Sequence, residues 1–177
     1  EPTLVPSPEG ESFDTNLAPI IKADGSMLGL GRPPYIWRAS DWKDAESYEV
    51  VELDDTIIGE DPFLFTDPRN GENILHAISH AGGWDSRGGH SWSDDGGDNW
   101  NSILDVAAYG SLFLEEDENK EVIEVSLSRR ERPHLVFDGD GVPVALTNAV
   151  TPFWPCNHPE NCPHDHCYTS LQMLNAE

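Results

Sequence analysis

Two segments of the sequence place an acidic side chain within two residues before a proline. These segments are Glu60-Asp61-Pro62 and Glu131-Arg132-Pro133. If the fold brings Asp61 and Glu131 together, one carboxyl group with a raised pKa and one ionised partner would form the acid pair of a glycosidase. A structural alternative stays open, in which Glu131 only pairs with the arginines at positions 129, 130 and 132.

Histidine and tryptophan side chains form a second group of candidates, for contacts with a bound substrate. His76, His80, His90 and His134 could donate hydrogen bonds or hold a water molecule near the acids. Trp84 lies in a glycine-rich stretch and could stack on a sugar ring. Considered singly, each histidine could instead have a purely structural role.

The elements that must position these side chains are indicated by an internal repeat. Residues 18–28, 61–76 and 132–146 each read as a proline, a short apolar strand, an Asp-Gly or Asn-Gly turn and a second apolar strand. The prolines lie 43 and then 71 residues apart. A four-stranded propeller blade takes about 40–50 residues, so the spacing favours successive blades, although three unrelated hairpins would give the same pattern.

A further turn signal lies inside the longer interval. Residues 93–100 read Ser-Asp-Asp-Gly-Gly-Asp-Asn-Trp and match the Asp box of propeller blades, with Asn99 in place of threonine. In such a turn the aspartate and the glycines shape a hairpin, and the tryptophan fixes it onto the sheet. Asp95 and Trp100 are therefore predicted to be scaffold residues.

Composition narrows both the fold class and the function. The 15 glycines and 14 prolines leave little room for long helices, so the chain is predicted to be all-β, with short strands. The formal charge of -23 excludes a phosphate-binding surface, and hence nucleic acid as a partner. No apolar run approaches the roughly 18 residues of a membrane-spanning helix, so no membrane insertion is expected.

Five segments resemble five-bladed β-propellers related to glycoside hydrolase family 43. The resemblance spans about residues 12–172 and is carried by residues 16–26, 59–65, 75–77, 89–96 and 129–138. It implies that Glu131 is the general acid and that Asp61 tunes its pKa and holds its orientation. It also places His166, in an Asp-His-Cys-Tyr-Thr sequence, near the propeller axis. The general base of the family is not visible, because Leu17 and Ala18 stand where the first repeat would carry it.

The length of the chain conflicts with a complete five-bladed propeller. The 177 residues account for three to four blades, which predicts a fragment of a longer protein or a propeller completed by other protein chains. Residues 1–11 are expected to be an extension or linker, and residues 12–177 the blades with a Cys/His-rich C-terminal loop.

That loop contains Cys156, Cys162 and Cys167. In an acidic, loop-rich protein a disulfide is the first interpretation, with a zinc site or reduced thiols as alternatives, and no metal ligand is assigned. The acidic run at residues 115–121 is interpreted as a solvated loop. A calcium ion at the propeller centre stays open, because some of the proteins that the chain resembles carry one.

Two functions follow from these patterns. The first is a secreted, extracellular glycoside hydrolase-like propeller that acts on polysaccharide with inversion at the anomeric carbon. The second is a non-catalytic propeller that binds glycan or serves as a structural subunit of an extracellular assembly. The missing base favours the second function, and the acid pair favours the first.

Overall fold

The computed structural model describes residues 14–32, 35–53, 59–70, 74–80, 87–103, 107–116, 118–152 and 168–174. The predicted N-terminal extension, Trp84, His166 and the three cysteines lie outside these residues. Within them, no helix is long and apolar enough to cross a membrane.

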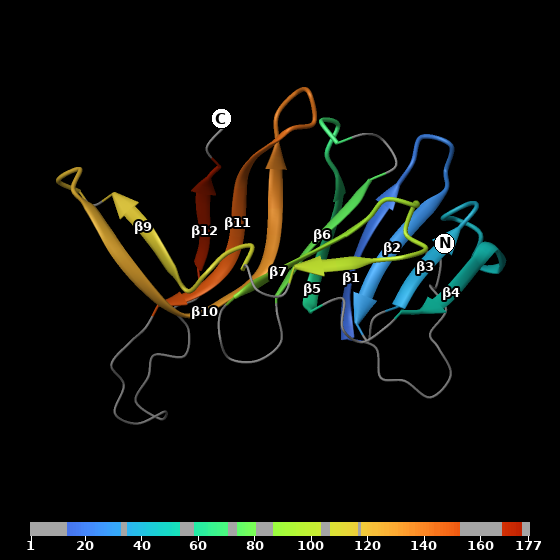
Figure 1. Cartoon of the computed structure of the whole chain (residues 1–177), viewed down its shortest axis with the longest axis horizontal. Helices are drawn as coiled ribbons and strands as arrows, with labels where there is room; N and C mark the ends of the chain where they lie inside the picture. Colours follow the sequence, from blue (N-terminus) through green and yellow to red (C-terminus); the bar gives the residue numbers. More distant parts are fainter. Residues whose placement is uncertain are drawn as a thin grey trace.

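The described chain forms three four-stranded antiparallel sheets that follow one another in sequence and in space (Figure 1). The first sheet consists of β1 (Asp14–Ile21), β2 (Met27–Arg32), β3 (Tyr35–Ala39) and β4 (Tyr48–Glu52), with the 3-10 turn η1 (Ala45–Ser47) before β4. The second consists of β5 (Glu60–Thr66), β6 (Leu75–His80), β7 (Gly88–Ser93) and β8 (Asn101–Ile103). The third consists of β9 (Leu112–Glu116), β10 (Val122–Phe137), β11 (Pro143–Pro152) and β12 (Tyr168–Met173).

The prediction of an all-β chain of short antiparallel strands is confirmed. Each repeat segment forms the predicted hairpin, because β1 pairs with β2, β5 with β6, and β10 with β11. The third sheet differs from the other two. The first half of the 16-residue β10 pairs with β9 and its second half with β11, so one long strand links two hairpins.

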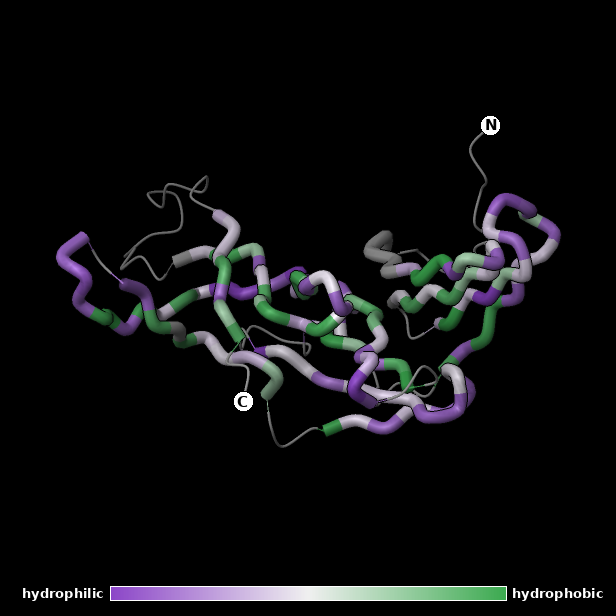
Figure 2. The backbone as a smooth tube through the Cα atoms, turned by 90° about the horizontal axis from the view of Figure 1, so that it is seen from above, coloured by the Kyte–Doolittle hydropathy of each residue, from purple (hydrophilic) through white to green (hydrophobic). Residues whose placement is uncertain are grey.

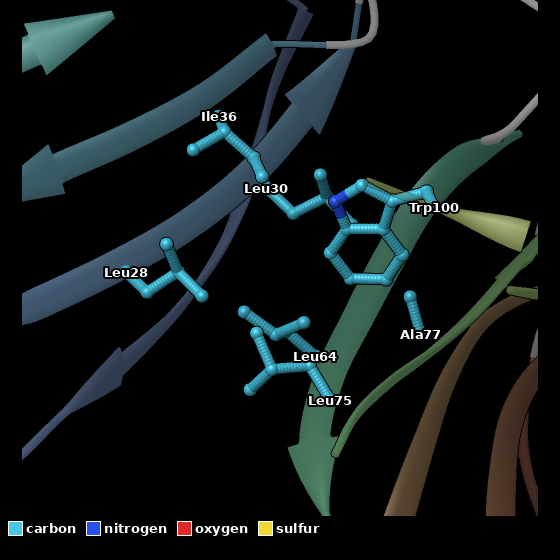
Figure 3. Close-up of a cluster of buried hydrophobic side chains, with 7 residues drawn as sticks. All are labelled: Leu28, Leu30, Ile36, Leu64, Leu75, Ala77 and Trp100. Carbon is cyan, nitrogen blue, oxygen red and sulfur yellow. The ribbon is translucent and has the colours of Figure 1, made fainter. Parts of the chain in front are cut away.

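The main hydrophobic core lies between the first two sheets (Figure 3). Hydrophobic residues are interleaved with hydrophilic ones along the chain, as expected for strands with one buried face (Figure 2). The buried side chains of this core are Leu28, Leu30, Ile36, Leu64, Leu75, Ala77 and Trp100. A smaller cluster joins the second and third sheets through Ile78, Tyr109 and Leu146.

Trp100 reaches the main core from the turn that the sequence predicted. Asp95 Oδ1 accepts hydrogen bonds from the backbone N–H groups of Asp98 (3.0 Å) and Asn99 (2.9 Å). Asn99, which replaces threonine in the motif, donates from its side-chain amide to Asp95 Oδ2 (2.7 Å). The Trp100 indole donates to the carbonyl of Gly97 (3.1 Å). The predicted scaffold role of this turn is therefore confirmed by its contacts.

Candidate functional site

Two β-bulges define the candidate site, and they occupy the same place in the second and third sheets. In β5, Glu60 pairs with His80 and Phe63 pairs with Ile78, so the segment between them holds one extra residue. In β10, Glu131 pairs with Ala149 and His134 with Thr147, with the same shift of register. The two acid–X–proline segments of the sequence are thus structurally equivalent.

The residue before the proline is strained in both bulges. Asp61 and Arg132 each have a φ of 52°, in the left-handed region that L-residues other than Asn, Asp and Gly seldom adopt. Pro62 and Pro133 cannot donate to the sheet ladder, which is why each proline is accommodated at a bulge. Because such strain concentrates at functional sites, its repetition here marks these bulges as candidates.

The two bulges lie side by side. The Arg132 Nε atom is 3.9 Å from Asp61 Oδ2, and the Asp61 side chain is only 12 % exposed. Two residues further along each strand, Phe63 and His134 are also in contact, with their ring centroids 4.8 Å apart. The structure therefore places His134 near Asp61, with an exposed side chain.

Glu131 is partly exposed at the bulge of β10. Its side chain is 31 % exposed, and Arg129 Nε lies 3.9 Å from its carboxylate. Its main-chain carbonyl accepts a hydrogen bond from the Asn148 side chain (3.4 Å). The Glu–Arg pairing that the sequence left open is present, at a distance typical of a weak ion pair.

Arg130 is a buried cation that the sequence did not single out for the site. It is 2 % exposed and donates to Asn148 Oδ1 (2.9 Å), to Gln172 Oε1 (2.7 Å) and to the Gly110 carbonyl (3.0 Å). Its guanidinium also lies over the Tyr109 ring, 4.8 Å from the centroid. Burial lowers its pKa from the ordinary value, while the neighbouring tyrosine opposes this shift.

Tyr109 is a second residue that sequence reasoning missed. It is 5 % exposed, and its hydroxyl lies beside the side chain of Asn148. Burial raises the pKa of this hydroxyl far above its ordinary value, and the carboxylates of Asp61 and Glu131 raise it further, against the effects of Arg130 and of a hydrogen bond with Asn148. The hydroxyl is therefore a neutral donor that lies within the electrostatic reach of both candidate acids.

The predicted histidines separate into two groups. His76 pairs with Phe65 at the far end of β5, whereas His80 pairs with Glu60 beside the bulge. Four residues along a strand span about 13 Å, so His76 lies well away from Asp61. His90, on β7, lies next to His76, and nothing in the sequence separates these two histidines from the acids.

His76 and His90 form a unit of their own. His76 Nδ1 is 3.1 Å from His90 Nε2, and the two rings stack with centroids 5.3 Å apart. Burial lowers the pKa of both imidazoles. They line a cavity of about 340 Å³ between the second and third sheets, together with Phe65, Leu135 and Leu146.

The acidic run and the metal candidates give no site in the described chain. Its described members from Glu115 to Glu121 are exposed, as predicted, but Glu115 and Glu116 belong to β9 and only residues 118–121 form the loop. Among the residues that the structure describes, no group of three histidine, cysteine, aspartate or glutamate side chains could hold a metal ion.

The first sheet carries a related bulge that the sequence analysis overlooked. Asp14 pairs with Arg32 and Ala18 with Leu30, so the register shifts between them, and Pro19 pairs with Gly29 beyond the bulge. By register, Asp14 is the last paired residue before the bulge, as Glu60 and Glu131 are in the other two sheets. The signal was hidden in the sequence because this bulge holds more residues than the others.

Comparison with known proteins finds no matching family model, no matching curated protein and no matching solved structure. The resemblance to family 43 propellers therefore stays a prediction, and the site has to be interpreted from its own geometry.

Proposed function

We propose that this protein is a secreted, glycoside hydrolase-like β-propeller that acts on polysaccharide. The observation that carries the proposal is the pair of equivalent bulges on β5 and β10, which lie side by side and carry Asp61 and Glu131 on adjacent sheets. Carboxylates from two neighbouring strands are the groups that glycoside hydrolysis requires.

In the proposed reaction Glu131 protonates the leaving oxygen of the glycosidic bond. Its partial exposure allows the proton that it loses to be replaced from solvent. Asp61, more deeply buried and held by Arg132, stays ionised and orients the acid. A water activated by a third carboxylate attacks the opposite face of the sugar, which inverts the anomeric carbon.

The carboxylate that activates this water is left unassigned. An inverting pair needs about 6.5–9.5 Å between its carboxyl groups, so that a water fits between the base and the sugar. Glu131→Gln should abolish turnover while leaving glycan binding in place.

A non-catalytic glycan-binding propeller is the second candidate. It is favoured by the arginine within 4 Å of each acid, Arg132 beside Asp61 and Arg129 beside Glu131, because acids that pair with arginines can serve the structure alone. Other protein chains that complete a propeller would suit either candidate. Val136, Leu171 and Met173 are exposed on the third sheet, on the face opposite Leu146, where a further sheet would pack.

The two candidates are separated by measuring turnover and binding on the same preparation. Hydrolysis is measured with aryl arabinosides, xylosides and galactosides, and binding with an array of plant and algal polysaccharides. Turnover that is lost in Glu131→Gln supports the enzyme. Binding without turnover supports the second candidate, and the absence of both contradicts the proposal.

A further inference from the structure

The cavity between the second and third sheets has no role in the proposed reaction, because neither Asp61 nor Glu131 lines it. Its volume is about 340 Å³. An apolar cavity of roughly 150 Å³ already binds one benzene molecule, so this one has room for two rings. Most of its wall is apolar and includes Phe65, Ile78, Ala107, Leu135 and Leu146. The cavity therefore suits a mainly apolar small molecule.

The two charged side chains of the cavity neutralise each other. Arg69 donates from Nε to Asp67 Oδ1 (2.9 Å) and from Nη2 to Asp67 Oδ2 (2.6 Å). The Asp67 side chain is only 7 % exposed, so the pair is fixed and carries no net charge. His76 and His90 are neutral at pH 7, because burial lowers both pKa values. The cavity therefore favours an uncharged ligand.

Hydrogen bonds fix the positions of the hydrogens on the two histidines. Asn70 Nδ2 lies 3.2 Å from His76 Nε2, and an amide nitrogen only donates, so His76 Nε2 carries no hydrogen. The single hydrogen of the neutral His76 ring is therefore on Nδ1 and is donated to His90 Nε2, 3.1 Å away. By the same rule, His90 carries its own hydrogen on Nδ1.

The Nδ1–H group of His90 is the open end of this chain of hydrogen bonds. No described residue accepts from it. It is also not among the described side-chain atoms that are buried without a partner, so it is accessible, in a residue that lines the cavity. The cavity thus offers one neutral donor, and a ligand needs an acceptor oxygen to match it.

The rings beside this donor are nearly parallel. Phe65 and His76 are inclined by 23°, with centroids 5.2 Å apart, and His76 and His90 by 15°, with centroids 5.3 Å apart. Aromatic ligands pack against such rings in offset or edge-to-face arrangements. A sugar would leave most of its hydroxyls unpaired against the apolar wall, so this cavity does not suit the glycan of the proposed reaction.

We propose that the cavity binds an uncharged aromatic molecule whose oxygen accepts a hydrogen bond from His90 Nδ1. Aryl ketones, esters and ethers form this class. The inference goes beyond the proposed function and does not depend on it.

The test compares benzophenone, an uncharged aryl ketone, with diphenylmethane, which has the same two rings without the oxygen. Equilibrium dialysis should show that wild type binds one molecule of either probe per chain. Ala107→Trp fills the cavity and should weaken the binding of both probes at least tenfold. Ala23→Trp, at an exposed alanine between β1 and β2, is the control and should bind both as wild type does.

His90→Phe separates the hydrogen bond from the apolar contacts. It keeps a ring but removes the donor, so the affinity for benzophenone relative to diphenylmethane should fall about tenfold. His134→Phe, which changes a histidine outside the cavity wall, should keep the wild-type ratio. A measurement on wild type needs no variant: benzophenone, but not diphenylmethane, should shift the nitrogen-15 resonance of His90 Nδ1.

Three results would overturn the inference. The first is that wild type binds neither probe, and the second is that Ala107→Trp binds both as tightly as wild type. The third is an unchanged affinity ratio in His90→Phe together with an unchanged His90 resonance, which would exclude the hydrogen bond. None of these results bears on hydrolysis by Glu131, so the two proposals fail separately.

Discussion

The guanidinium of Arg132 lies 3.9 Å from the carboxylate of Asp61, and the two residues occupy the same position in successive sheets. Both have a φ of 52°, and both precede a proline at a bulge. The contact is too long and too exposed to stabilise the fold by more than about 1 kcal/mol. The contact instead fixes the position of β5 relative to β10, the two strands that carry the candidate acids.

The strained backbone at Arg132 gives the first prediction. In an ordinary strand glycine is less stabilising than alanine by about 0.5–1 kcal/mol, but at positive φ the order reverses. Arg132→Gly should therefore have a free energy of unfolding about 1 kcal/mol higher than Arg132→Ala, as measured by urea denaturation. At the exposed Glu124 of the same strand, the glycine variant should be the less stable one. If the glycine and alanine variants had the same order of stability at both positions, the backbone at Arg132 would not be strained.

The contact between Gly88 and Tyr109 gives the second prediction. Gly88→Ala places a methyl group 2.2 Å from the Tyr109 ring, so the ring must move and the variant should lose about 1–3 kcal/mol. Gly139→Ala is the control, because a Cβ there meets nothing within 4 Å. Thermal unfolding of both variants measures the difference. If Gly88→Ala were as stable as Gly139→Ala, Tyr109 would not be held as described.

The His76–His90 pair gives the third prediction, on pH. Burial lowers both pKa values below 6.5, and only for His76 does Asp67 oppose the shift. As the pH falls below about 6.5, the unfolded chain binds protons that the folded chain does not, so the free energy of unfolding decreases. Protonation of both rings would also break their hydrogen bond, which requires one bare nitrogen.

Urea denaturation at several pH values checks this. His90→Gln should show a weaker loss of stability between about pH 7 and pH 5 than wild type, whereas the exposed His134→Gln should retain the wild-type dependence. Identical pH profiles for the two variants would show that the buried pair does not cause the loss.

Local features of the fold could be predicted from the sequence because their causes are local. An Asp-Gly pair needs only its own backbone to form the turn in which Asp24 Oδ1 accepts from Ser26 N (2.9 Å). The Asp95 turn is likewise closed by residues within a few positions of one another. The acids at the two prolines could also be located, since the bulges follow from the prolines themselves.

The remainder of the site depends on contacts between distant segments. Arg130 bonds to Gln172, 42 positions away, and nothing near Arg130 in the sequence indicates that partner. Tyr109 lies outside any strand and becomes part of the site only because Gly88 leaves room for its ring. For His76, the residue type suggested a site, but the strand register places it at the other end of β5.

The most direct measurement of the central claim is the hydrolysis rate of Glu131→Gln, with Glu124→Gln as the control. Both residues lie on β10 and both substitutions remove one negative charge, but Glu124 is exposed and outside the bulge. With aryl arabinosides, xylosides or galactosides, Glu131→Gln should lower kcat by about 100-fold or more, and by less when the leaving group is more acidic. Glu124→Gln should match wild type. Equal rates for wild type and Glu131→Gln would contradict the account.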